Sequence, residues 1–204
     1  MSCYWKKLGR LYIPKDNNPH TKLMSHAANP LPVHINGDVY RIFYSGRDAL
    51  NRSSVGAVDI DIINRKVIEE YRDPFFEYGE AGSFYSHGVS IGNCYYSNGT
   101  NYMLFMGWQN SPNKHWRGDI GRLILKEDLT LQLDSSAPFI GSDAVDPISL
   151  SYPWVQSRAS GILDMWYGST VSWAADNDEM VHVINHATSE DGDTWLKHGL
   201  SVPY

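Results

Sequence analysis

Residues 24–58 read MSHAANPLPVHINGDVYRIFYSGRDALNRSSVGAV, and the rest of the chain is organised around this stretch. Its Asn36-Gly37 pair stands between two β-prone runs, which is the strongest short indication of a β-hairpin. A polar loop from Gly46 to Ser54 then leads into a third β-prone segment. The stretch therefore predicts a strand, a tight turn, a second strand, a polar loop and a third strand, and Val67-Ile68 predicts a fourth strand after it.

The same pattern returns twice farther along the chain. The segment Tyr40–Ser45 is followed 62 residues later by Tyr102–Gly107, and 61 residues after that by Leu163–Gly168. Four short strands per repeat are typical of a β-propeller blade, and no long segment has helical periodicity with caps. We therefore expect an all-β fold, a β-propeller of four-stranded antiparallel blades at about residues 25–70, 84–134 and 150–199, in one domain over residues 1–204.

Composition and charge exclude several classes of partner. The net charge of the 204 residues is -6 and no run of Lys and Arg is longer than two, so we expect no binding to nucleic acid. No apolar run approaches the roughly 20 residues of a membrane-spanning helix, and the N-terminus lacks the apolar segment of a signal peptide. We therefore expect a soluble cytoplasmic protein without a membrane partner. Cys3 and Cys94 match no metal or redox spacing and the eight histidines are scattered, so we expect no metal and no cofactor.

Several short motifs resemble a known group of propellers. They are the blade openings Asn29-Pro30 and Tyr152-Pro153-Trp154-Val155, the second strands Arg41–Ser45 and Asp164–Gly168, and the outer turn Ser189-Glu190-Asp191-Gly192-Asp193-Thr194-Trp195. Together they resemble the five-bladed β-propeller glycosidase superfamily, which holds arabinanases, xylosidases, invertases and mannosyl phosphorylases. A closer resemblance, to uncharacterised members of the superfamily, is carried by Ser25-His26-Ala27, Arg47-Asp48, Asn51-Arg52-Ser53 and Gly56. We interpret the outer turn as structural, with Asp191 and Thr194 closing a hairpin and Trp195 capping the blade edge.

The resemblance implies a catalytic arrangement from which this chain departs. In the superfamily three acids, one from the innermost strand of each of the first three blades, converge at the mouth of the central channel, where carboxyl groups flank the scissile bond. Here Asn29 precedes Pro30 in blade one, segment 84–88 of blade two carries His87, and Ser151 stands before Tyr152 in blade three. Asparagine cannot act as a general base and serine cannot act as a general acid near neutral pH, so we do not expect hydrolysis by the usual carboxylates.

A different set of polar groups is expected at the channel mouth. Arg47, Asp48, Asn51 and Arg52 fall on the loop between strands two and three of blade one. The planar fork of arginine suits carboxylate or phosphate, so the expected partner is a saccharide or nucleotide-sugar ligand, an acidic sugar in particular. The alternative is that Arg47, Asp48 and Arg52 pair internally and hold the loop. If the chain is catalytic, we expect Asp48 as acid/base and His87 as its partner; the expected substrate-binding residues are His26, Asn29, Arg47, Asn51, Arg52, Ser86, Trp108, Tyr152 and Trp154.

The predicted function is that of a glycoside hydrolase-like, carbohydrate-active propeller that binds or processes a saccharide at the channel mouth. Two alternatives stay open: a non-catalytic saccharide-binding module, and a scaffold propeller, although the Gly-His and Trp-Asp motifs of kelch and WD repeats are absent. Trp108, Trp154 and Trp173 are candidates for stacking on a sugar ring, with core packing as the alternative.

The size of the repeat raises a question of completeness. Five blades of about 61 residues need roughly 300 residues, so we expect a fragment of a longer protein whose open blade edges can self-associate. The alternating segment Trp5–Ile13 is expected to form a further strand that completes a sheet with distant sequence.

Overall fold

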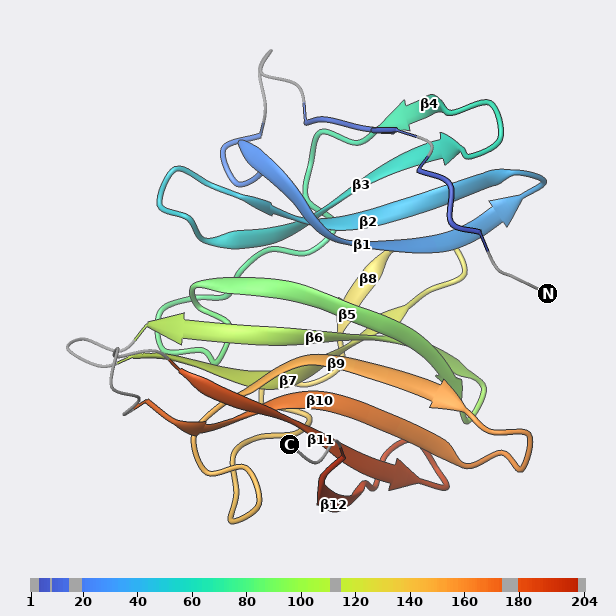
Figure 1. Ribbon diagram of the computed structural model, residues 1–204. Helices are drawn as coiled ribbons and strands as arrows, with labels where there is room; N and C mark the ends of the chain where they lie inside the picture. The colour runs from blue at the N-terminus through green and yellow to red at the C-terminus, as the bar shows by residue number, and fades with distance from the viewer. Residues whose placement is uncertain (1–3, 8, 15–19, 111–114, 174–179, 202–204) are drawn as a thin grey trace.

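The computed structural model describes residues 4–7, 9–14, 20–110, 115–173 and 180–201, and this part of the chain is built from β-strands (Figure 1). It contains no helix, and so none long and apolar enough to cross a membrane. The predicted all-β class is therefore confirmed. The twelve strands of the described part are β1 (Ser25–Asn36), β2 (Val39–Arg47), β3 (Ser53–Asp61), β4 (Lys66–Glu70), β5 (Gly88–Ser97), β6 (Thr100–Asn110), β7 (Trp116–Leu125), β8 (Leu131–Leu133), β9 (Leu150–Ser157), β10 (Leu163–Ser172), β11 (Val181–Ser189) and β12 (Leu196–Leu200).

The strands form three antiparallel units in which each strand pairs with the next along the chain. Unit 1 consists of β1 to β4, unit 2 of β5 to β8 and unit 3 of β9 to β12, and Figure 1 shows unit 1 at the top and β10 to β12 of unit 3 at the bottom. In unit 1, Asn36 pairs with Val39 across a two-residue turn, so the hairpin predicted at Asn36-Gly37 is confirmed.

Unit 2 is packed on both of its faces. Phe105 on β6 belongs to a buried cluster with Phe43 of unit 1, whereas its neighbour Leu104 belongs to a cluster with Leu150 of unit 3. Since successive side chains of a strand point to opposite faces, adjacent residues of β6 fill two different cores. This explains why residues 103–106 form an unbroken apolar run, which is typical of a strand covered on both sides.

Asparagine side chains connect the first strands of neighbouring units. Asn93 on β5 donates from Nδ2 to the carbonyl of Val155 on β9 at 2.7 Å, and its Oδ1 accepts the N–H of Val155 at 2.8 Å. Asn29 on β1 donates to the carbonyl of Ile91 on β5 at 3.4 Å. In each bond the two residues are 62 positions apart in the sequence. The hydrogen bonds between units therefore follow the same spacing as the sequence repeat.

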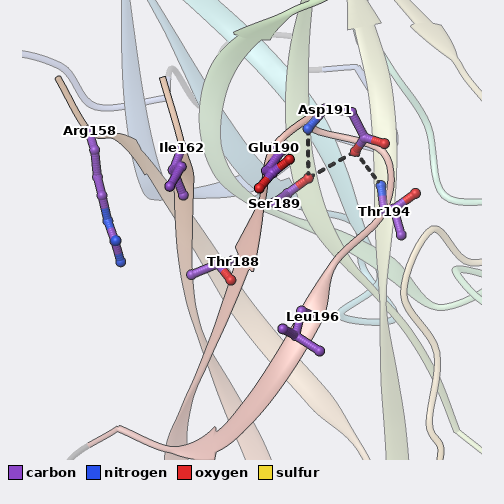
Figure 2. A pocket seen from close by; sticks show the side chains of 8 residues that line it. All are labelled: Arg158, Ile162, Thr188, Ser189, Glu190, Asp191, Thr194 and Leu196. Carbon is purple, nitrogen blue, oxygen red and sulfur yellow. Dashed lines mark hydrogen bonds between the residues drawn. The ribbon is translucent and has the colours of Figure 1, made fainter. Parts of the chain in front are cut away.

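The turn at residues 189–195 has the structural role that its sequence indicates (Figure 2). Asp191 Oδ1 accepts the N–H of Thr194 at 2.7 Å and that of Asp193 at 2.8 Å, and Ser189 Oγ donates to it at 3.0 Å. These donors stabilise the ionised carboxylate and lower the pKa of Asp191 to about 2. The prediction that Asp191 closes the hairpin is confirmed.

The same turn fastens unit 3 to unit 2. The hydroxyl of Tyr95 donates to the carbonyl of Gly192 at 2.9 Å, and Arg122 Nη1 lies 2.5 Å from Asp193 Oδ1. The ring of Trp195 lies 6.4 Å from that of Tyr95 and packs against the core between the two units. Trp195 was expected to cap the edge of its blade. In the structure it packs between units 2 and 3.

The expectation of a strand at Trp5–Ile13 is wrong for the residues that the structure describes there. Gly9 has a φ of +97°, a left-handed conformation that interrupts an extended chain. The segment lies against unit 1 instead, because the hydroxyl of Tyr12 donates to Glu70 Oε1 at 2.8 Å.

Candidate functional site

Units 1 and 2 meet at the ends of four strands, β2, β3, β5 and β6. A parallel bridge joins Ser53 to Gly88, and the N–H of Ser53 donates to the carbonyl of His87 at 3.1 Å. The N–H of His87 in turn donates to the carbonyl of Trp108 at 3.0 Å. These backbone bonds place the end of β2 beside residues far away in the sequence. We call this place the junction site and define it by Arg47, Ser53, Ser86, His87 and Trp108.

Trp108 is fixed at the end of β6 by its neighbours. Its indole N–H donates to Ser53 Oγ at 3.1 Å. A Cβ added to Gly88 would lie 2.1 Å from the indole nitrogen and 2.2 Å from Ser53 Oγ, distances that no side chain tolerates. Glycine at this position therefore makes room for the bond between Trp108 and Ser53, and the indole is held in one orientation.

Arg47 is the cation of the junction site. It is partly buried, its Nη1 donates to the carbonyl of Asn51 at 3.0 Å, and its Cζ lies 5.9 Å from the ring centroid of Trp108. Among the residues that the structure describes, no carboxylate forms an ion pair with Arg47. A guanidinium that lies beside an indole and has no carboxylate partner among these residues is suited to bind an anion.

His87 presents a defined face to the junction site. Its Nδ1 accepts the N–H of Asn110 at 3.3 Å, and Ser86 Oγ lies 3.1 Å from the same nitrogen. Since an acceptor nitrogen carries no proton, the neutral ring has its N–H at Nε2, where it is a donor. The ring of His87 lies 6.1 Å from that of Trp108.

Asp48 holds the loop after β2. Its Oδ1 accepts the N–H groups of Leu50 and Arg52, each at 2.8 Å, and its Oδ2 accepts Arg52 Nε at 2.8 Å. Burial alone would raise the pKa of Asp48, but these bonds outweigh it and hold the pKa below its usual range. Internal pairing, the alternative left open for this loop, therefore holds for Asp48 with Arg52, whereas Arg47 bonds a carbonyl instead.

The other two loop residues also shape the loop. Asn51 adopts a φ of 62°, a left-handed conformation that asparagine tolerates better than most residues. The guanidinium of Arg52 lies 4.2 Å from the ring centroid of Tyr78, which the sequence did not single out. Lys22 Nζ lies 4.5 Å from the same ring, so two cations share one aromatic residue beside the loop.

Two of the expected binding residues occupy equivalent bulges in units 1 and 3. Asn29 has a φ of 52° and Tyr152 a φ of 45°, and each is followed by proline at a register shift of the first strand. A left-handed backbone costs a residue with a Cβ about 1–3 kcal/mol, and such strain gathers at functional sites. His26, with a φ of 64°, adjoins Ser25, which pairs with Arg47, so it lies at the same end of unit 1 as the junction site.

Tyr152 and Trp154 line a separate hollow. They are 59% and 56% exposed, and the other residues that line this hollow of about 410 Å³ all belong to unit 3.

Of the expected site residues, the structure therefore brings together Arg47, Asp48, Asn51, Arg52, Ser86, His87 and Trp108, with His26 nearby. It does not bring Tyr152 and Trp154 to them. Ser53, Tyr78 and Gly88 were missed, since no sequence pattern marks a residue that only positions another.

A second hollow, of about 430 Å³, lies beside the turn of unit 3 (Figure 2). Arg158 lines it, but its guanidinium is already paired with Asp164 through Nε and Nη2, each at 2.5 Å. Asp191 is engaged by its own turn. In the described part of the chain, no group of three His, Cys, Asp or Glu side chains is placed to hold a metal ion.

No family model matches the chain. Over 194 residues it is 39% identical to an uncharacterised protein of Mycobacterium tuberculosis, which occurs in two strains, and the match covers 95% of this chain. It covers 64% of the relative, so the chain spans a little under two thirds of the length of these curated relatives.

Three similar solved structures are described as enzymes that act on sugars or glycosides. One is described as a glycoside hydrolase (TM-score 0.74, 15% identity, 98% of this chain and 63% of that chain). A second is an endo-arabinase from Bacteroides thetaiotaomicron VPI-5482 (0.65, 16%, 98% and 69%), and a third is a sucrose-6-phosphate hydrolase from Lactobacillus gasseri (0.63, 15%, 91% and 37%). At this level of identity the likeness shows the fold alone, which is that of the propeller-type glycoside hydrolases.

Proposed function

We propose that the chain binds an anionic saccharide at the junction site, with Arg47 as the residue that holds the acidic group. The observation that carries this proposal is the position of Arg47, beside Trp108 and without a carboxylate partner in the described part of the chain. A guanidinium offers two parallel donors that match the two oxygens of a carboxylate or a phosphate. The ligand class is therefore a uronic acid, a sugar phosphate or a nucleotide sugar.

The neighbours of Arg47 supply the other contacts that a sugar needs. The indole of Trp108 offers an apolar face to the ring carbons of a pyranose. His87 offers its Nε2–H to a hydroxyl, and the oxygen of the Ser86 hydroxyl can accept a hydrogen bond. Two of the similar structures are described as an endo-arabinase and a sucrose-6-phosphate hydrolase. Both descriptions agree with a saccharide ligand for this chain.

The geometry favours binding over hydrolysis. Both oxygens of Asp48 are engaged in its loop and its pKa is lowered, so it does not readily carry the proton that a leaving group requires. The bulges of units 1 and 3, where the superfamily places acids, carry Asn29 and Tyr152. If turnover is found, Asp48 and His87 stay the proposed pair, and Asp48→Asn should abolish turnover while binding persists.

The test is a binding survey with matched variants. Wild type, Arg47→Ala and Arg47→Lys are titrated with glucuronic acid, galacturonic acid, glucose 6-phosphate, UDP-glucose and neutral glucose. The control is Arg72→Ala, which removes an equal charge from an exposed position. We expect an acidic ligand to bind the wild type and the control alike, to bind Arg47→Ala about 100-fold more weakly, as for the loss of a charged hydrogen bond, and to be partly restored by lysine. Equal binding by Arg47→Ala would sink the proposal.

A further inference from the structure

Four aromatic side chains gather at the same end of units 2 and 3. His115 stacks on Trp173 with ring centroids 4.1 Å apart and planes at 7°. Trp116 meets Trp173 edge to face at 5.7 Å, and His182 lies 6.4 Å from Trp116. We call these residues the aromatic cluster. His115 and Trp116 lie just before and at the start of β7, Trp173 directly follows β10, and His182 lies at the start of β11.

The cluster is placed at the surface rather than in the core. None of its members belongs to the three buried clusters of the described residues. His115 and His182 are exposed, and both indoles are partly exposed. Apolar rings that are ordered against one another and yet left in contact with water are typical of a binding surface.

Strand pairing connects the cluster to the junction site. Trp116 on β7 pairs with Asn110 on β6, and the N–H of Asn110 is the donor to His87 Nδ1. Gly118 pairs with Trp108, two residues farther along the same strands than the pair of Trp116 and Asn110. Two residues of a strand span about 7 Å, which is comparable to one hexose unit. A chain of two or three sugars is therefore long enough to reach from Trp108 to Trp116.

The chemistry of the cluster differs from that of the junction site. Its rings offer apolar faces edged by N–H groups, which suits the C–H face and hydroxyls of a pyranose without charge. Nδ1 of His182 lies 3.2 Å from Thr170 Oγ1, and partial desolvation lowers the pKa of the His182 ring. An aromatic surface therefore adjoins one that carries the charge of Arg47.

We propose that the aromatic cluster is a second subsite, which stacks a neutral pyranose of an oligosaccharide whose acidic unit is bound by Arg47. The inference rests on the proposed function for its acidic unit, and it adds that the ligand is an oligosaccharide of mixed charge rather than a single sugar. It assigns a binding role to Trp173, for which core packing was the alternative, and to Trp116, which sequence reasoning passed over.

The experiment compares sugars that differ by one neutral unit. The probes are glucuronic acid, galacturonic acid and glucose 6-phosphate, the disaccharides that link each of them to one neutral hexose, and the neutral trisaccharides cellotriose and maltotriose. The proteins are wild type, Trp173→Ala, Trp116→Ala, Arg47→Ala and the control Tyr96→Ala, which removes a 62% exposed ring from the far end of β5. Thermal midpoints verify that each variant is folded, and calorimetric titration measures affinity.

We expect the acidic disaccharide to bind about tenfold more tightly than its monosaccharide, and Trp173→Ala and Trp116→Ala to remove that gain while leaving the monosaccharide unaffected. Acidic monosaccharides that bind through Arg47 without any gain from the neutral unit would overturn the inference and leave the proposed function standing. Neutral trisaccharides that bind through Trp173 while no acidic sugar binds would support the second subsite and overturn the role of Arg47. Binding of none of the probes to the folded wild type would overturn both.

Discussion

The carboxamide of Asn93 is paired with the backbone of Val155 in the way that two peptide groups pair in a sheet, donating to the carbonyl at 2.7 Å and accepting from the N–H at 2.8 Å. Both residues are buried between units 2 and 3. One side chain therefore satisfies a donor and an acceptor that have no access to water.

Asn93→Ala should lower the free energy of unfolding by about 2–4 kcal/mol, because it leaves two buried backbone groups without partners. Urea unfolding measures the change. Asn101→Ala, at an exposed position of β6, is the control and should cost much less. An equal loss for the two variants would show that the pair between Asn93 and Val155 contributes little.

Gly88→Ala should disturb Trp108. The new methyl group would lie 2.1 Å from the indole nitrogen, so the indole must move and its bond to Ser53 must break. We expect a loss of about 1–3 kcal/mol in stability and a shift of one indole N–H resonance in the NMR spectrum. Gly141→Ala is the control, since a Cβ there meets its nearest atom at an ordinary 3.4 Å. An unchanged indole spectrum in Gly88→Ala would contradict the packing described here.

Asp191→Asn tests the turn of unit 3 by its pH dependence. The folded pKa of Asp191, about 2, lies below the ordinary 3.8, so its contribution to stability is complete above the ordinary value and is lost as the pH falls toward 2. The urea midpoint of the variant should therefore lie below that of the wild type at neutral pH, and the difference should shrink as the pH falls from about 5 to about 2. A difference that stays constant over this interval would argue against the ionised turn.

Cys94 should be unreactive in the folded protein. Burial raises the pKa of its thiol from 9.0 to about 12, so at pH 8 its thiolate fraction falls by about 1,000-fold. In a Cys3→Ser variant Cys94 is the remaining cysteine. Its reaction with Ellman's reagent should be slow in buffer and fast in urea. Equal rates would mean that the hydrophobic core between units 1 and 2, against which Cys94 packs, opens readily.

Much of the fold can be predicted from the sequence because it is written in local patterns. The Asn36-Gly37 turn and the period between Tyr40–Ser45 and Tyr102–Gly107 depend on backbone preference and alternation, which act over a few residues. The prediction of a strand at Trp5–Ile13 was wrong, because alternation alone cannot tell a strand from an extended segment that has no strand to pair with. In addition, the left-handed conformation of Gly9 interrupts this segment.

The candidate site was predicted only in part, for a physical reason. The loop residues Arg47, Asp48 and Arg52 stand out in the sequence, but whether a charge is free or paired depends on which neighbours folding brings to it. Asp48 forms an ion pair with Arg52, whereas Arg47 has no carboxylate partner in the described part of the chain, and the two arginines look alike in the sequence. The contribution of Ser53 depends on a bridge between units that no local pattern reveals.

The hydrogen bond from Tyr95 to Gly192 spans 97 residues of chain. Contacts that close such long loops form late, because the entropy of closure must be lost before the contact stabilises anything, and chains rich in them fold slowly. The contacts of the turn at residues 189–195 with Tyr95 and Arg122 should therefore be among the last to form. Until they do, the Trp195 side of unit 3 is exposed, and that interval is when the chain is most open to wrong partners.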